Sequence, residues 1–183
     1  MARRVLTLCL LFLFAAIAGS EEKMPEPRYN ASGELLMPEG YREWMFVGAN
    51  LDMGYSEGGP PPNSMFHNIY IQRQAYQQYV KTGKFPDKTM LVMENLSAGG
   101  NASINKRGKF EDKHSGIEVA LKDEKRFPEK WAYFIMFDGQ RKPLASAKAM
   151  AKDRCWKCHN EHAAVDNVFL QFYPVLRDAR PLP

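Results

Sequence analysis

The chain has 183 residues, a length that suits one domain with a sizeable core and hardly two. Its formal net charge is +4, and loss of the two arginines in its first segment would leave +2. So small a charge offers no case for a nucleic-acid-binding protein.

The chain opens with MARRVLTLCLLFLFAAIAGSEE, the pattern of a secretory signal peptide. Two arginines are followed by an apolar run, and small residues then lead to a cleavage site near Ala18 or Ser20. An uncleaved membrane anchor is the alternative, but the apolar run is short for a span. We therefore expect residues 1–20 to be removed, leaving an exported protein with no membrane span.

Residues 21–40 contain three prolines and predict an irregular N-terminal arm. Beyond the arm, apolar runs and alternating patterns predict strands. Residues 41–48 are expected to be a strand or the entry to one, and further strands are expected at 65–71, 89–96, 116–122 and 131–137. The last is apolar on both faces, as a central strand would be. The long polar segment 97–115 is expected to form a loop.

Helical spacing appears in three places. Ala75, Tyr76 and Tyr79 share one helical face, and Gly83 suits the end of that helix. A second helical pattern starts at Leu144 and runs into a pair of cysteines, and a third follows over 168–176. The expected fold is α+β: an antiparallel sheet packed with a few helices, with the cysteine motif on a C-terminal helix.

That motif lies in DRCWKCHNEH, residues 153–162, where Cys155 and Cys158 are followed at once by His159. A disulfide or a redox-active pair is possible in an exported protein, although a thioredoxin-like pair belongs beside a βαβ unit. A zinc site could add His162, but zinc ligands usually come from two separated pairs. C-x-x-C-H is the signature of covalent haem attachment, and it is the interpretation we prefer.

The haem interpretation gives each residue of the motif a role. Cys155 and Cys158 lie one helical turn apart and would form thioether bonds to the two vinyl groups of one haem c. His159, the next residue, would then be the proximal iron ligand. Thioether attachment takes place outside the cytoplasm, which agrees with the signal peptide and predicts a periplasmic protein.

The chain resembles a family of β-sheet haem proteins, cytochrome P-460 and cytochrome c′-β. The resemblance covers nearly all of the chain after the signal peptide, in four blocks in the same order. The blocks are GELLMPEGYREWMFVG, IYIQRQAYQQYVKTGKFPDKTMLVMEN, GIEVALKDEKRFPEKWAYFIMFD and CWKCHNEHAAVDNVFLQFYPVLRDA. It implies that 41–183 is one haem domain, with an antiparallel sheet against which haem packs, usually within a homodimer.

The resemblance also shows where this chain departs from the hydroxylamine-oxidising members. Those enzymes cross-link their haem through a lysine, and Met93 occupies the matching position. They also use a distal acid or base before the haem motif, where LASAKAMAK has no carboxylate. Both departures point away from hydroxylamine oxidation and make an enzymatic role uncertain.

Met93 is expected to point toward the haem, on the same strand face as Leu91. It would either bind the iron opposite His159, as in electron-transfer cytochromes, or only fill space. The leading hypothesis is an electron carrier that meets a redox partner protein. The alternatives are a five-coordinate protein that binds nitric oxide or another small gas, and a hydroxylamine-oxidising enzyme. Five other methionines compete as ligands: Met45, Met53, Met90, Met136 and Met150.

Overall fold

The computed structural model describes residues 22–55, 57–59 and 61–180 of the chain. The predicted signal peptide, residues 1–20, lies outside these ranges. No helix within them is long and apolar enough to cross a lipid bilayer.

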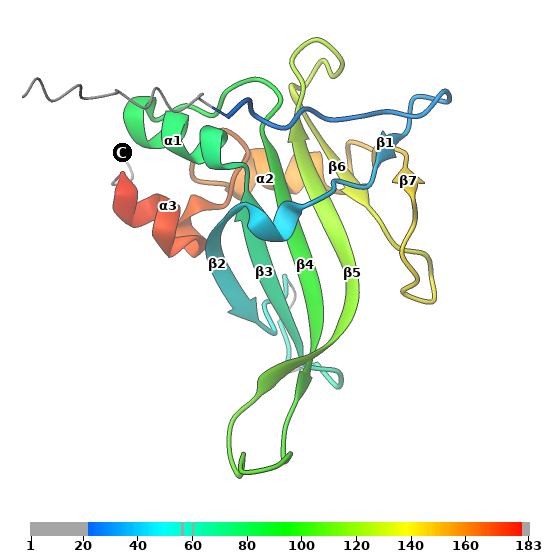
Figure 1. Cartoon of the computed structure of the whole chain (residues 1–183), viewed down its shortest axis with the longest axis vertical. Helices are drawn as coiled ribbons and strands as arrows, with labels where there is room; N and C mark the ends of the chain where they lie inside the picture. Colours follow the sequence, from blue (N-terminus) through cyan, green and yellow to red (C-terminus); the bar gives the residue numbers. More distant parts are fainter. Residues whose placement is uncertain (1–21, 56, 60, 181–183) are drawn as a thin grey trace, which may run out of the picture.

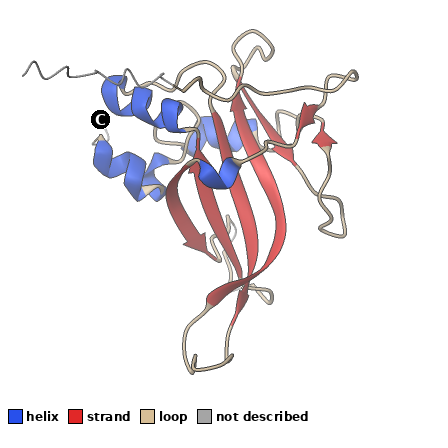
Figure 2. Ribbon diagram, in the orientation of Figure 1, coloured by secondary structure: helices blue, strands red, loops and turns tan. Residues whose placement is uncertain are grey.

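A five-stranded antiparallel sheet forms the centre of the molecule (Figures 1 and 2). Its strands follow one another in space as they do in sequence, in the order β2-β3-β4-β5-β6. They are β2 (Met45–Leu51), β3 (Met65–Ile71), β4 (Met90–Gly99), β5 (Phe110–Lys122) and β6 (Trp131–Ile135). A second, two-stranded sheet pairs β1 (Leu35–Leu36) with β7 (Ser146–Ala147). Together with the helices, these sheets confirm the predicted α+β class.

Three helices pack on one face of the sheet. They are α1 (Arg73–Thr82), between β3 and β4, and α2 (Trp156–His162) and α3 (Pro174–Ala179), after the last strand. Figure 1 shows α1 and α3 beside β2, with α2 behind the strands. A buried apolar cluster joins Tyr79 of α1 and Leu176 of α3 to Leu91 and Tyr133 of the sheet. The haem-attachment motif therefore lies on a helix near the C-terminal end, followed by η2 (Leu170–Phe172) and α3.

The N-terminal arm covers the opposite face of the sheet, together with η1 (Tyr41–Glu43) and the β1–β7 pair. A second buried cluster there contains Leu35 of β1 and the sheet residues Val92, Val119 and Phe134. Because successive residues of a strand point to opposite faces, Leu91 packs under the helices while Val92 packs under the arm.

Strand β6 differs from the prediction, because it forms an edge of the sheet and not its centre. It is nevertheless covered on both faces, by the helix-side cluster at Trp131 and Tyr133 and by the arm-side cluster at Ala132 and Phe134. Its outer edge is partly paired too, since the backbone N–H of Met150 donates to the Tyr133 carbonyl at 2.8 Å. The apolar residues on both faces of β6 therefore predicted its burial correctly and its place at the centre of the sheet wrongly.

Two further expectations need correction. The segment 97–115 is not one loop, because β4 continues to Gly99 and β5 begins at Phe110, so that the two strands form a projecting hairpin (Figure 1). The helical pattern that starts at Leu144 does not form a helix before the motif. That segment contains β7 instead, and α2 begins only at Trp156. Pairing with β1 and with the edge of β6 overrides the intrinsic helix propensity of its alanines and lysines.

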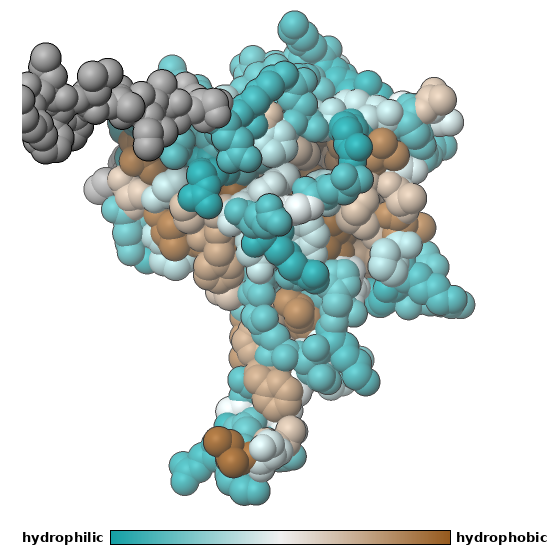
Figure 3. All heavy atoms as spheres, in the orientation of Figure 1, coloured by the Kyte–Doolittle hydropathy of each residue, from teal (hydrophilic) through white to brown (hydrophobic). Residues whose placement is uncertain are grey.

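The face of the molecule seen in Figure 3 is largely hydrophilic, with apolar spheres at the end of the projecting hairpin. Two large apolar side chains of this hairpin are exposed, Ile104 in its loop and Phe110 at the start of β5. Leu51, at the end of the edge strand β2, is also exposed.

Candidate functional site

A cavity of about 240 Å³ lies on the helix-covered face of the sheet. Residues from β3, β4, β5 and β6 form one side of it, and residues from α2 and the segments around β2 and η2 complete it. The lining residues are Asn50, Met53, Tyr55, His67, Ile69, Leu91, Met93, Glu118, Ala120, Tyr133, His159, Phe169 and Tyr173. We call this cavity the sheet pocket.

Antiparallel pairing explains why these side chains meet. Ile69, Met93 and Glu118 are direct cross-strand neighbours on β3, β4 and β5, so all three project from the same face. Leu91 and Ala120 form the next row along the strands, and their neighbours on that face also belong to the pocket or its core. The predicted shared direction of Leu91 and Met93 is therefore seen in the structure.

His159 reaches the sheet pocket from α2, and its ring is held from several sides. Its Nδ1 atom lies 2.9 Å from the backbone carbonyl oxygen of Asn167. Its ring centroid lies 4.1 Å from that of Tyr133 and 4.4 Å from that of Phe169. Both aromatic side chains also line the pocket. The imidazole is therefore fixed by one hydrogen bond and by two aromatic rings.

The hydrogen bond decides which ring nitrogen is available. A carbonyl oxygen can only accept, so Nδ1 of His159 must carry the proton. Burial lowers the pKa of His159, and the hydrogen bond to Asn167 opposes this effect only in part. The imidazole is therefore neutral near pH 7, and its Nε2 lone pair is available to a metal ion.

The two cysteines of the motif lie beside His159. Cys155 is the residue before the first turn of α2, and its carbonyl accepts the backbone N–H of His159 at 3.1 Å. Both Cys155 and Cys158 are free thiols with intermediate exposure. Cys155 packs against the helix-side core, and burial, and then the charge of Glu118, raise the pKa of its thiol. One turn of helix thus presents two free thiols and an imidazole together.

This donor set fits a covalently attached haem. Free thiols at the attachment spacing, a neutral imidazole with Nε2 available and apolar pocket walls are what such a group requires. The disulfide interpretation has no support, because the two cysteines are not bonded to each other. A zinc site has none either, since no three His, Cys, Asp or Glu side chains within 22–55, 57–59 and 61–180 converge as metal ligands.

Among the competing methionines, the structure narrows the choice for a distal ligand. Only Met93 and Met53 of the six contribute to the sheet pocket. Met90 and Met136 belong to the cluster under the N-terminal arm, on the opposite face of the sheet. Met45 packs against the helix-side core without lining the pocket. Iron ligation by Met93 stays a prediction.

The sheet pocket also contains a carboxylate, Glu118, to which the sequence pattern assigned no role. Glu118 on β5 pairs with Met93 of β4 on one side and with Ile135 of β6 on the other. The Asn95 side-chain Nδ2 donates to Oε1 of Glu118 at 3.4 Å. Burial raises the pKa of Glu118, and the Asn95 contact and the charge of Arg141 only partly offset this effect. Alternation in GIEVALK places Glu118 on the strand face opposite to that of the buried Ile117 and Val119. From the sequence pattern alone, that second face is predicted to meet solvent.

His67 is a further pocket residue to which the sequence pattern assigned no role. It lines the pocket from β3, and burial lowers its pKa. By contrast, His162 is exposed on α2, and His114 lies 3.5 Å from Glu94, which packs on the other face of the sheet. No local pattern in the sequence distinguishes His67 from His114, because the strand pairing of each residue decides what its side chain meets.

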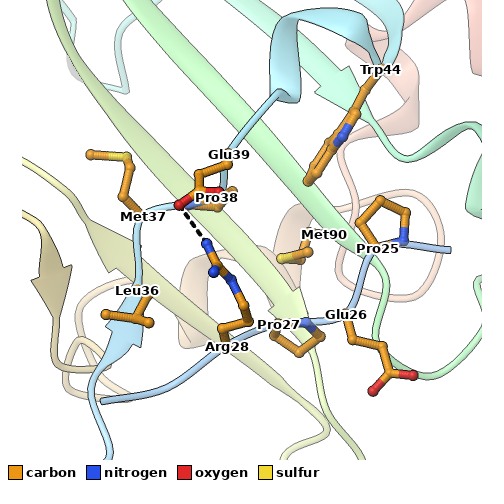
Figure 4. A pocket seen from close by; sticks show the side chains of 10 residues that line it. All are labelled: Pro25, Glu26, Pro27, Arg28, Leu36, Met37, Pro38, Glu39, Trp44 and Met90. Atoms are coloured by element: carbon orange, nitrogen blue, oxygen red, sulfur yellow. Dashed lines mark ion pairs between the residues drawn. The ribbon is translucent and has the colours of Figure 1, made fainter.

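A second cavity, of about 300 Å³, lies under the N-terminal arm (Figure 4). It is lined by prolines and apolar side chains, including Trp44 and Met90, and an ion pair of 2.6 Å between Arg28 and Glu39 crosses its rim. Its lining residues include no histidine or cysteine. The sheet pocket is therefore the candidate haem site.

Comparison with known proteins agrees with this assignment. A family model, Cytochrome P460, matches residues 38–170, a span that includes the five-stranded sheet, the C-x-x-C-H motif and every residue of the sheet pocket except Tyr173. A search of the curated proteins gave no match. The resemblance inferred from the sequence is confirmed by the family match. With its central sheet, its haem-type donor set and this match over most of its length, the chain belongs to the cytochrome P460 family.

Proposed function

We propose that this haem-binding cytochrome is a c-type, monohaem electron carrier, with His159 as the proximal ligand and Met93 as the distal ligand. The observation that carries the proposal is that Met93, from the sheet, and His159, from α2, line the same pocket. Haem c would supply one-electron redox chemistry at its iron.

The residues of α2 would attach and orient the cofactor. Cys155 and Cys158 would hold it through thioether bonds, which fix it to the one helical turn that also carries His159. The Asn167 carbonyl keeps the proton of His159 on Nδ1, so that Nε2 carries no proton and would be available to hold the iron.

Met93 suits the second axial position on chemical grounds. A thioether is a soft, neutral ligand, and a His/Met pair favours ferrous iron and raises the reduction potential. An iron with both axial positions filled has no vacant site for a substrate, which suits electron transfer without catalysis.

A small-gas binder is the second candidate. Ile69, Leu91 and Ala120 give the sheet pocket apolar walls, which suit a small uncharged gas. If Met93 only packs against these walls, a five-coordinate haem would leave room for nitric oxide. Glu118 also supplies a carboxylate for a hydroxylamine-oxidising site, although Met93 replaces the cross-linking lysine of such enzymes.

The location follows from the same proposal. Thioether attachment of haem outside the cytoplasm and the pattern of the first 20 residues both support export to the periplasm.

Absorption spectra of Met93→Leu, Met53→Leu and Met90→Leu variants test the electron-carrier proposal. Leucine keeps most of the volume of methionine, so each variant should fold with a modest loss of stability. We expect a wild-type low-spin spectrum with a far-red sulfur-to-iron band and no response to nitric oxide. Met93→Leu should lose that band, become high-spin and bind nitric oxide.

Met90→Leu is the matched control, since Met90 lies on the same strand but faces the arm. It should keep the wild-type spectrum. A band that disappears in Met53→Leu instead would move the ligand to Met53. A wild-type protein that is already high-spin and binds nitric oxide would overturn the proposal in favour of gas binding.

A further inference from the structure

The turn that holds His159 in place is itself anchored to the sheet. Val165 and Val168 form an antiparallel bridge, and the Val168 backbone N–H donates to the Val165 carbonyl at 2.8 Å. The two residues between them, Asp166 and Asn167, both have positive φ, 46° and 60°. Aspartate and asparagine tolerate this conformation better than other side chains, so the turn is tight and its carbonyls have fixed directions.

A single cross-strand pair clamps Asp166. Lys122 at the end of β5 is paired with Trp131 at the start of β6. The Lys122 Nζ donates to Oδ2 of Asp166 at 2.8 Å, and the Trp131 Nε1–H donates to Oδ1 at 3.0 Å. The two carboxylate oxygens of Asp166 are therefore each held by a different strand.

The lysine of this clamp is unusually buried for a charged residue. Its side chain is 8% exposed, and its ammonium also donates to the Phe85 carbonyl at 3.0 Å. A buried ammonium needs partners, and Asp166 supplies the closest charged one.

The next residue of the turn contacts the site directly. The Asn167 carbonyl accepts from Tyr133 at 3.2 Å and lies 2.9 Å from Nδ1 of His159. Tyr133 lies two residues after Trp131 on β6, on the same face of the strand. The rigid sheet therefore fixes both Asp166 and Asn167, and through them the imidazole.

We propose that Asp166, clamped by Lys122 and Trp131, is a positioning residue that sets the electron-donating strength of His159 by fixing the Asn167 carbonyl against Nδ1. The inference rests on the proposed function, because it requires His159 to be an iron ligand. A hydrogen bond accepted from the far nitrogen of a metal-bound imidazole makes that imidazole a stronger donor and favours ferric iron. Weakening the clamp should therefore raise the reduction potential.

Redox titration of the purified holoprotein tests this proposal. Asp166→Asn keeps a side chain that tolerates the turn but removes the charge that pairs with Lys122. Lys122→Met keeps the aliphatic stem and removes the ammonium. Loss of an outer-sphere partner of a metal-bound histidine typically changes metal affinity or activity by about tenfold or more. We expect each variant to shift the ferrous-to-ferric equilibrium about tenfold toward ferrous iron, which is about +59 mV for one electron.

Two comparisons separate positioning from general loss of stability. Asp123→Asn breaks another buried aspartate–lysine pair, with Lys88, that does not touch the turn. It should lower the unfolding temperature and leave the potential unchanged. The Lys122→Met, Asp166→Asn double variant should shift the potential no further than either single variant, because both act through one carbonyl.

Unchanged potentials in both clamp variants, or an equal shift in Asp123→Asn, would overturn the proposal. If Asp166→Asn does not fold, Trp131→Phe removes one clamp hydrogen bond and should give a smaller shift of the same sign. A wild-type protein that carries no covalent haem would instead contradict the proposed function, which the haem content of the wild type reveals first.

Discussion

Glu118 and Met93 are cross-strand neighbours in the same pocket, one polar and one apolar. The sequence drew attention to Met93 because of the resemblance, and it gave no reason to look at Glu118. With Glu118 present, the absence of a carboxylate from LASAKAMAK no longer means that the pocket lacks a base. The remaining feature that speaks against hydroxylamine oxidation is Met93, which stands where those enzymes have the cross-linking lysine.

Gly48 shows how one missing side chain shapes the pocket. A Cβ atom there would lie 3.0 Å from Cδ of Pro174 and 3.3 Å from the Phe172 carbonyl oxygen. Gly48→Ala should therefore push the start of α3, and with it Tyr173 of the pocket, away from β2. We expect the free energy of unfolding to fall by about 1–3 kcal/mol, the usual cost of overpacking, in chemical denaturation.

Gly54→Ala is the control for that experiment, because no heavy atom lies within 4 Å of a Cβ at position 54. It should leave the unfolding midpoint nearly unchanged. Equal midpoints for wild type and Gly48→Ala would show that α3 can adjust at no cost.

At the scale of elements, helix α2 depends on its surroundings. It has only seven residues, too few to be stable as an isolated helix in water. Trp156 at its start packs against the helix-side core, and its indole N–H donates to the Glu129 carbonyl at 3.3 Å. The haem motif is therefore helical because the sheet and its loops hold it there.

The start of β4 and the turn after β5 are joined by a buried ion pair. The Asp123 carboxylate accepts from Lys88 and from the backbone N–H of Arg126, and Tyr29 of the N-terminal arm donates to it at 3.2 Å. Burial alone would raise the pKa of Asp123, but Lys88 and these hydrogen bonds hold it below its usual range.

The sign of the pH effect follows from that lowered pKa. The unfolded chain binds the proton of Asp123 more tightly than the folded chain does, so the pair stabilises the fold above about pH 4 and less in acid. Asp123→Asn should lower the free energy of unfolding by about 2 kcal/mol at pH 7. The difference from wild type should shrink as pH falls through the folded pKa of Asp123.

Denaturation curves measured at a series of pH values between about 2.5 and 7, which spans the usual pKa of aspartate, check this prediction. Asp178→Asn serves as the control, since its ion pair with Arg177 is exposed and should be worth little at any pH. A constant deficit for Asp123→Asn across the whole range would show that packing, and not charge, is lost.

At the scale of the whole molecule, one face of the sheet faces the arm and the other the helices, and among the residues that the structure describes only the helix side carries the donor set of a haem. The homodimer that the resemblance implies stays a prediction. A partner subunit would bury apolar surface where it covers the large apolar side chains that the described residues expose, which are Phe46, Leu51, Tyr55, Ile104, Phe110 and Phe172.

Covalent haem attachment can be tested on the whole chain. Expressed with its first 20 residues in a host that matures c-type cytochromes, the protein should lose that segment and keep its haem through denaturing electrophoresis. A Cys155→Ser, Cys158→Ser double variant should lose the haem stain, because no thioether can form. Mass spectrometry of the purified chain measures both the cleavage and the added haem.

Cys9→Ser is the matched control, because Cys9 lies in the segment that should be removed. It should leave haem content unchanged. A double variant that still stains, or an uncoloured wild type that contains zinc, would contradict haem attachment through these cysteines.

The sequence by itself determined the chemistry of side chains that lie close together along the chain. Cys155, Cys158 and His159 lie within five residues, so one helical turn was enough to predict what they could hold. Strand alternation likewise predicted that Met93 and Leu91 share a face, because a period of two needs no knowledge of the partner strand. Only the tertiary structure decided which face Glu118 meets, that β6 is an edge, and that residues 144–151 are not a helix. It also brought Lys122 to Asp166 across 44 residues of sequence, a contact set by how α2 and its turn pack on the sheet and by no pattern within either segment.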